Sequence, residues 1–129
     1  MGSAGAEQVL VVEDEAVVRD LLVRVLRDQG LGVEACADGE EALRRLRGPA
    51  GPVRYALVIC DVRLPRRSGI ELYQSLRDDG GPAVPFVFIT GDTLSAQTGG
   101  LLRSLGVPHL NKPFEIEEFV ALVRRELAR

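Results

Sequence analysis

The chain has 129 residues, of which 46% are hydrophobic and 27% are charged, and its net charge at pH 7 is −3. This length and composition predict one globular domain and exclude disordered, collagen-like and disulfide-rich proteins. The acidic balance argues against a nucleic-acid-binding surface spread over the whole domain. The apolar runs are far shorter than the roughly 18–20 residues of a membrane-spanning helix, so we expect no membrane insertion.

Both cysteines, Cys36 and Cys60, lie inside apolar runs and form no metal-binding pattern. We expect them to be buried thiols in a reducing compartment, which predicts a cytoplasmic location. Residues 1–6 are expected to be a flexible leader or a cloning remnant, and residues 7–129 the domain itself.

Short apolar runs alternate with amphipathic stretches along the chain. Strands are predicted, in chain order, at Gln8–Val12, Gly32–Cys36, 55–60, 84–89 and 107–110. Helices are predicted between them at 16–29, 38–46 with a capping box from Asp38 to Glu41, 70–77 behind a Ser68 cap, 94–105 and 114–127. Residues 48–52 are expected to be a turn-rich insert, and Gly99 and Gly100 to weaken the fourth helix by about 1 kcal/mol each. Five β–α pairs of this kind predict an α/β fold with a doubly wound parallel sheet.

Polar residues stand at the ends of the four strongest strand patterns. In chain order they are Glu13, Asp14, Glu15, Asp61, Thr90 and Lys112. Because the carboxyl ends of parallel strands share one edge of a sheet, we expect these side chains to converge there. Lys112 is the single lysine among 16 basic residues, which favours a site that needs a compact ammonium group.

Such a cluster has a coherent chemistry. Clustered carboxylates favour a hard divalent cation such as Mg²⁺, or Mn²⁺, bound through oxygen. One carboxylate can then attack phosphorus, while the Thr hydroxyl and the Lys ammonium neutralise phosphoryl oxygens. Each residue alone also fits a plain structural role, namely a turn, a helix cap or a solvated loop charge. The presence of suitable polar residues at the ends of all four strands favours a functional site over four separate structural roles.

The segments VLVVEDE, LVICDVRLP, FVFITGD and LNKPF occur in this order and resemble the response-regulator receiver domain of two-component signalling, the CheY-like family. The resemblance covers essentially the whole chain and implies a flavodoxin-like (βα)5 sheet in the order 2-1-3-4-5. It implies that Asp61 is the phosphoacceptor. It further implies that Asp14 binds Mg²⁺ directly, that Glu13 assists, and that the Arg63 backbone carbonyl completes the protein ligands. Thr90 and Lys112 are expected to contact the phosphoryl group.

Several positions depart from the family's usual pattern. His109 stands where the family often has an aromatic switch residue that works with Thr90, and it is expected either to fill that role or to be an exposed strand histidine. Glu13 and Glu15 are expected to alter the outer shell of the metal. Arg63 and Asp92 are expected to influence access of the hydrolytic water. Arg66 and Arg67 are expected to be solvated or to attract an acidic partner or an anionic phosphodonor.

The resemblance also implies partners. A histidine kinase or a histidine phosphotransfer domain is the expected phosphodonor, and the chain is expected to be a monomer or a weak oligomer without direct contact to nucleic acid. The segments TGDTLSAQT and GVPHLNKPF are more similar to receivers attached to kinases, so the resemblance slightly favours a receiver from a hybrid sensor kinase over a stand-alone shuttle. We expect self-phosphorylation and self-dephosphorylation without turnover of a diffusible substrate.

Two alternatives stay open at this point. The first is a receiver-like binding module that is never phosphorylated. Loss of Asp14, Asp61 or Lys112 would have supported it, but all three residues are present. A phosphatase of the haloacid-dehalogenase type is the other, but its second aspartate, two positions after the nucleophile, is replaced here by Arg63. A nucleotide-binding domain is disfavoured, because no glycine-rich loop follows the first strand.

Overall fold

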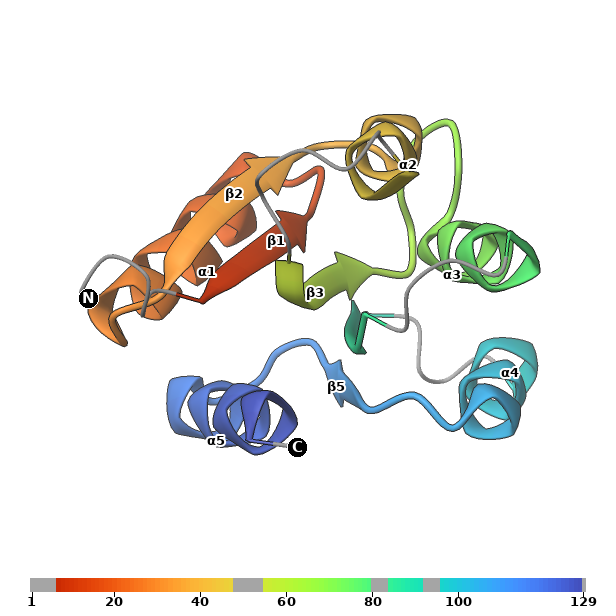
Figure 1. Cartoon of the computed structure of the whole chain (residues 1–129). Coiled ribbons are helices and arrows are strands. Elements are labelled where there is room, and N and C mark those ends of the chain that lie inside the picture. Colours follow the sequence, from red (N-terminus) through yellow and green to blue (C-terminus); the bar gives the residue numbers. More distant parts are fainter. Residues whose placement is uncertain (1–6, 48–54, 80–83, 92–95, 129) are drawn as a thin grey trace.

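The computed structural model describes residues 7–47, 55–79, 84–91 and 96–128 (Figure 1). The predicted leader at 1–6 and the predicted insert at 48–52 lie outside these residues. The elements are β1 Gln8–Val12, α1 Ala16–Asp28, β2 Gly32–Cys36, α2 Gly39–Arg47, β3 Tyr55–Asp61, α3 Gly69–Asp78, β4 Phe86–Thr90, α4 Ala96–Leu105, β5 His109–Asn111 and α5 Ile116–Leu127.

The five strands form one parallel sheet in the order β2-β1-β3-β4-β5, which confirms the predicted topology. β1 lies between β2 and β3, so its last residue, Val12, pairs with Cys36 on one side and with Cys60 on the other. The acidic residues that follow β1 therefore lie beside the end of β3. Both cysteines are buried and free, as predicted.

Alternate residues of the strands feed two separate hydrophobic cores, because successive side chains of a strand point to opposite faces of the sheet. Leu10, Val58 and Phe88 pack with residues of α2, α3 and α4 on one face. Val11 and Ile59 pack with α1 and α5 on the other. Figure 1 shows these two helical layers on opposite sides of the sheet. Burial on both faces explains why the central strands read as continuous apolar runs. Among the described residues, no helix combines the length and the apolar character that crossing a membrane requires.

The strand ends differ slightly from the sequence prediction. β3 and β4 each include one polar residue more than predicted, because Asp61 pairs with Ile89 and Thr90 pairs with Asn111 in the ladder. β5 begins at His109 instead of Val107, since its pairing with β4 starts only there. These shifts make Asp61 and Thr90 part of the sheet itself, so backbone pairing with neighbouring strands holds them.

Two helix caps were predicted. The cap at Ser68 forms as predicted, whereas only half of the predicted capping box forms at α2. Ser68 and Glu71 make a full capping box at α3. At α2 the Asp38 side chain accepts from the backbone N–H of Glu41 at 2.8 Å. The Glu41 carboxylate pairs with Arg45 one turn later, so the reciprocal half of the predicted box is replaced by an ion pair.

Gly69 opens α3 against the backbone of the phosphoacceptor candidate. A Cβ atom at this position would lie 2.3 Å from the backbone oxygen of Asp61. We expect Gly69→Ala to lower the free energy of unfolding by about 2 kcal/mol or more, because the backbone there must move. Gly100→Ala is the matched control, since its Cβ would approach only the end of Arg103, at 3.9 Å. It should raise the same quantity by about 0.5–1 kcal/mol through helix propensity. Urea unfolding of both variants checks this, and a neutral Gly69→Ala would contradict the close approach.

Candidate functional site

The carboxyl edge of the sheet brings the predicted site residues to one place. Glu13 follows β1 directly, Asp61 ends β3 and Thr90 ends β4, and all three are buried. Lys112 follows β5, and its backbone N–H donates to the carbonyl of Thr90 at 2.8 Å. Residues that are far apart in the sequence therefore meet, as the sequence analysis predicted.

The Lys112 ammonium is the centre of this cluster. Its Nζ lies 2.8 Å from Oδ2 of Asp61 and 3.0 Å from Oε1 of Glu13. A third carboxylate, Glu15, contributes its Oε1 at 3.2 Å. The side chains of Glu13 and Asp61 are 1% and 7% exposed, so two of the three ion pairs lie largely away from water. Such pairs depend strongly on both partners, because removing one leaves an uncompensated buried charge.

Asp61 is held at both oxygens. Its Oδ1 accepts from the backbone N–H of Arg63 at 3.0 Å, and its Oδ2 accepts from Lys112. The carboxylate faces an open hollow of about 400 Å³ that is lined by Asp14, Glu15, Asp61, Arg63, Gly91 and Lys112. Thr90 is fully buried just before Gly91 and does not line this hollow. The arrangement presents one oriented carboxylate, next to a cation, to a ligand from solvent.

Burial dominates the electrostatics of Glu13. It raises the pKa of this carboxyl to about 7, and the hydrogen bond from the Glu15 backbone N–H, together with the neighbouring Lys112, only partly offsets the effect. For Lys112 itself burial acts to lower the pKa, but hydrogen bonding to Asp61 and Glu13 outweighs it and the pKa is raised. At neutral pH the cluster therefore contains a fixed cation and a carboxyl group that is close to its own titration point.

We expect the stability of the metal-free protein to fall between pH 5 and pH 8 because of Glu13. A folded-state pKa of about 7, above the ordinary 4.5, means that the folded state keeps a proton that the unfolded state has lost. The stabilisation is complete below pH 4.5 and is lost as the pH rises through 7, amounting to at most about 3 kcal/mol. Urea unfolding in EDTA checks this. Glu13→Gln should flatten the slope, whereas the exposed control Glu117→Gln should keep it; equal slopes in wild type and Glu13→Gln would contradict the assignment.

Three carboxylates could hold a cation here. Glu13, Glu15 and Asp61 each offer an oxygen atom, and these atoms lie within 4.8 Å of one another. Hard oxygen donors of this kind suit Mg²⁺. The predicted direct ligand, Asp14, is exposed and lines the same hollow, but its carboxylate is not part of this convergent set. The donor set fits a divalent cation, and the role of Asp14 and of the Arg63 carbonyl stays a prediction.

The structure shows specific contacts in the site region that the sequence did not predict. Glu15 was expected to lie in the cluster and to alter the outer shell of a metal, and the structure adds a direct contact with Lys112. Arg66 and Arg67 were expected to be solvated or to attract a partner; Arg66 is indeed 69% exposed, and the two side chains also pair with Asp38 and Glu40 around the start of α2. Arg66 reaches this contact from a left-handed backbone conformation, φ 68°, which nothing in the sequence signals.

The remaining predicted residues lie outside the hollow or outside the described residues. His109 is exposed on β5, two positions before the strand ends, which matches the plainer of its two predicted readings. Its role as a switch stays a prediction. Asp92, predicted to influence water access, lies outside the described residues.

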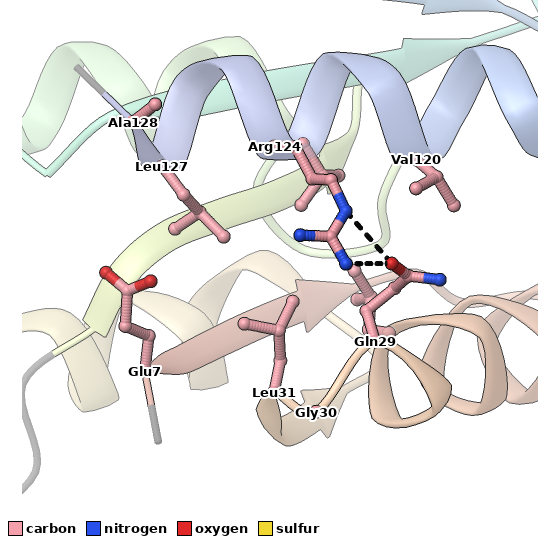
Figure 2. A pocket seen from close by; sticks show the side chains of 10 residues that line it. Glu7, Gln29, Gly30, Leu31, Val120, Arg124, Leu127 and Ala128 are labelled. Carbon is pink, nitrogen blue, oxygen red and sulfur yellow. Dashed lines mark hydrogen bonds between the residues drawn. The ribbon is translucent and has the colours of Figure 1, made fainter. Parts of the chain in front are cut away.

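A second hollow, of about 370 Å³, lies at the opposite end of the sheet between α1 and α5 (Figure 2). Apolar side chains such as Leu31 and Leu127 line it, and Arg124 crosses it to donate to Oε1 of Gln29 at 3.0 Å. It lacks the convergent carboxylates of the other edge. The chemistry of the described residues is therefore concentrated at the carboxyl edge.

The model of the response regulator receiver domain family matches residues 9–124. The chain belongs to this family. A receiver domain is not an enzyme for diffusible substrates, so the phosphatase alternative loses its support.

Similar proteins agree with this membership. The DNA-binding response regulator MtrA of Mycolicibacterium paratuberculosis is 36% identical over 123 residues, which cover 95% of this chain and 52% of MtrA. The receiver domain of the sensor histidine kinase PA1611 from Pseudomonas aeruginosa PAO1 is 28% identical, with a TM-score of 0.83 over 97% of this chain and 100% of that one. That structure has a magnesium ion coordinated in its active-site cleft.

A response regulator receiver protein from Pseudomonas putida is 30% identical, with a TM-score of 0.82 over 94% of this chain and 98% of that chain. The chain spans about half the length of the curated relatives it matches. The receiver fold is thus shared with response regulators and with the receiver domain of a sensor histidine kinase.

Proposed function

We propose that this receiver accepts a phosphoryl group on Asp61. The observation that carries the proposal is the placement of one Asp61 oxygen against Lys112 in an open hollow, beside the buried Glu13. An aspartate nucleophile toward phosphorus needs an accessible carboxylate, neighbouring positive charge and orientation, and the site supplies all three. The likeness to a kinase receiver with a magnesium ion in its cleft supports the same chemistry.

In the proposed reaction the phosphorus–nitrogen bond of a phosphohistidine breaks and a bond forms between phosphorus and a carboxylate oxygen of Asp61. The histidine nitrogen leaves with the electron pair. The Arg63 N–H holds the other Asp61 oxygen in place, and Lys112 neutralises charge on the phosphoryl oxygens. Thr90 does not line the hollow in this conformation, and its side chain would turn toward the phosphoryl group to contact it. Mg²⁺, or Mn²⁺, would be held by Glu13, Asp14, Asp61 and the Arg63 carbonyl, and it supplies further neutralisation of phosphoryl charge.

The output is a change in conformation. We infer that Thr90 and Lys112, joined by a backbone hydrogen bond across β4 and β5, transmit phosphorylation to the surface that carries His109. A bound phosphoryl group shifts the balance between two conformations only to the extent that it contacts them differently. A repositioned Thr90 side chain would provide that difference.

The proposed phosphodonor is a histidine kinase or a histidine phosphotransfer domain in the cytoplasm. MtrA is a DNA-binding regulator about twice as long as the matched segment, so its DNA binding is not transferred to this domain. We propose that the receiver itself contacts proteins and not DNA, that it is a monomer or weak oligomer, and that it catalyses only its own phosphorylation and dephosphorylation. Attachment to a hybrid kinase stays a prediction.

Intact mass spectrometry after incubation with acetyl phosphate tests the proposal. With Mg²⁺ we expect a single phosphoryl adduct, and with EDTA none. Borohydride reduction followed by peptide mapping should place the modified residue at Asp61, because an acyl phosphate is reduced at the carboxyl carbon. A protein without adduct from acetyl phosphate, and without spectral change on addition of beryllofluoride and Mg²⁺, would support the non-phosphorylated binding module.

A further inference from the structure

Glu15 is one of the three carboxylates that could hold a cation, but its contact with Lys112 has no role in the phosphoryl transfer proposed above. Lys112 carries three N–H donors, and three carboxylates surround its Nζ at 2.8, 3.0 and 3.2 Å. Asp61 is the proposed nucleophile, and Glu13 is the buried partner next to it. Glu15 supplies the third contact, at the longest of the three distances.

Glu15 differs from its two companions in exposure. Its side chain is 63% exposed, whereas those of Glu13 and Asp61 are 1% and 7% exposed. An exposed ion pair is weak and screened by solvent, while the buried pairs persist because breaking them leaves a charge without a partner. When an anionic ligand enters the hollow, the Glu15 contact is therefore the one that gives way at the lowest cost.

The Glu15 side chain has no helix-capping task that would explain the contact. Glu15 is the N-cap residue of α1, but its side chain makes no capping hydrogen bond. Its backbone does the structural work: the N–H donates to Oε2 of Glu13 at 3.1 Å, and the carbonyl accepts from Arg19. A substitution at Glu15 can thus remove the carboxylate and leave these backbone bonds in place.

We propose that Glu15 is a positioning residue that holds the Lys112 ammonium in the unphosphorylated site and yields it to the phosphoryl oxygens. Glu15 lines the same hollow as Asp61 and Lys112, so its charge lies beside the space that an incoming anion would occupy. It therefore slows phosphorylation in two ways, by occupying one donor of Lys112 and by repelling the anion. The kinetic consequence rests on the proposed phosphorylation of Asp61; the contact itself does not.

The single lysine makes the contact directly observable. In protein labelled with ¹⁵N-lysine, the side-chain Nζ signal can come only from Lys112. In metal-free, unphosphorylated protein, Glu15→Ala should shift this signal and speed its hydrogen exchange with water, and Glu15→Asp should give a smaller change. Asp20→Asn, which removes an exposed charge from α1 away from the cluster, should leave the signal unchanged. An unchanged signal in Glu15→Ala would overturn the proposal, whether or not the protein is ever phosphorylated.

The rate of adduct formation tests the consequence. At saturating Mg²⁺, Glu15→Ala should react with acetyl phosphate about twofold to fivefold faster than wild type, as expected for loss of one exposed ion pair. Asp20→Asn should react at the wild-type rate. A slower Glu15→Ala would overturn the proposal. So would a drop of about tenfold or more in Mg²⁺ affinity that persists in a Lys112→Met background, because Glu15 would then act as a metal ligand and not through Lys112.

Discussion

Asp61→Asn should carry no phosphoryl group under conditions in which the wild-type protein is fully modified. The amide cannot form the acyl phosphate, and its remaining carbonyl oxygen can take the place of the oxygen that accepts from Lys112. We expect at least a thousandfold loss of adduct by intact mass, which is about 4 kcal/mol in activation free energy. The fold should persist, because the Lys112 ammonium keeps its contacts with the Glu13 and Glu15 carboxylates.

A matched carboxylate provides the control for this variant. Asp78 is an exposed residue at the end of α3, so Asp78→Asn removes the same charge without touching the site. It should form the adduct at the wild-type rate. Circular dichroism should show the same helix content in both variants. Phosphorylation of Asp61→Asn at the wild-type level would place the acceptor elsewhere.

Lys112→Arg should uncouple phosphorylation from the conformational response. The Nζ atom lies among three carboxylate oxygens at 2.8 to 3.2 Å, and a planar guanidinium group cannot direct donors to all three from the same position. We expect adduct formation to slow by about tenfold, roughly 1.4 kcal/mol. Amide chemical shifts of Thr90 and Asn111, which pair across β4 and β5, should change far less on addition of beryllofluoride than in wild type.

The exchange of lysine for arginine has an internal control in the reverse direction. Arg103→Lys alters an exposed side chain of α4, and the response to beryllofluoride should match that of wild type. A Lys112→Arg protein with a wild-type response would mean that the single lysine of the chain is not required at this site. Unfolding measurements on both variants separate a lost response from a lost fold.

Much of the site could be predicted because a parallel sheet converts strand ends into neighbours. Asp61, Thr90 and Lys112 are separated by tens of residues, yet each stands at the end of an apolar run, and the fold brings the ends together. The same argument does not distinguish Glu13, Asp14 and Glu15, which are consecutive. Which of them turns inward depends on the backbone angles of the β1–α1 loop, and apolar patterns carry no information about these angles.

The loop after Asp61 shows a second limit of such prediction. Arg66 adopts φ 68°, although a non-glycine residue rarely does so, and its guanidinium pairs with Asp38 from the β2–α2 turn. The contact requires both loops to be in place, so it is a product of tertiary structure and not of local preference. The strand ends illustrate the same point: Asp61 belongs to β3 only because a neighbouring strand pairs with it.

The concentration of reactive groups at one edge of the sheet leaves the other edge available for engineering. Gly30 forms an exposed turn between α1 and β2 at the far edge, with φ 85° and room around it. Exposed turns are where proteins best tolerate inserted sequence. A fluorescent or affinity module inserted there would report on the receiver without altering the distances between Asp61, Glu13 and Lys112. The turn at Gly30, where a sequence can be inserted, and the site around Asp61 thus lie at opposite edges of the sheet.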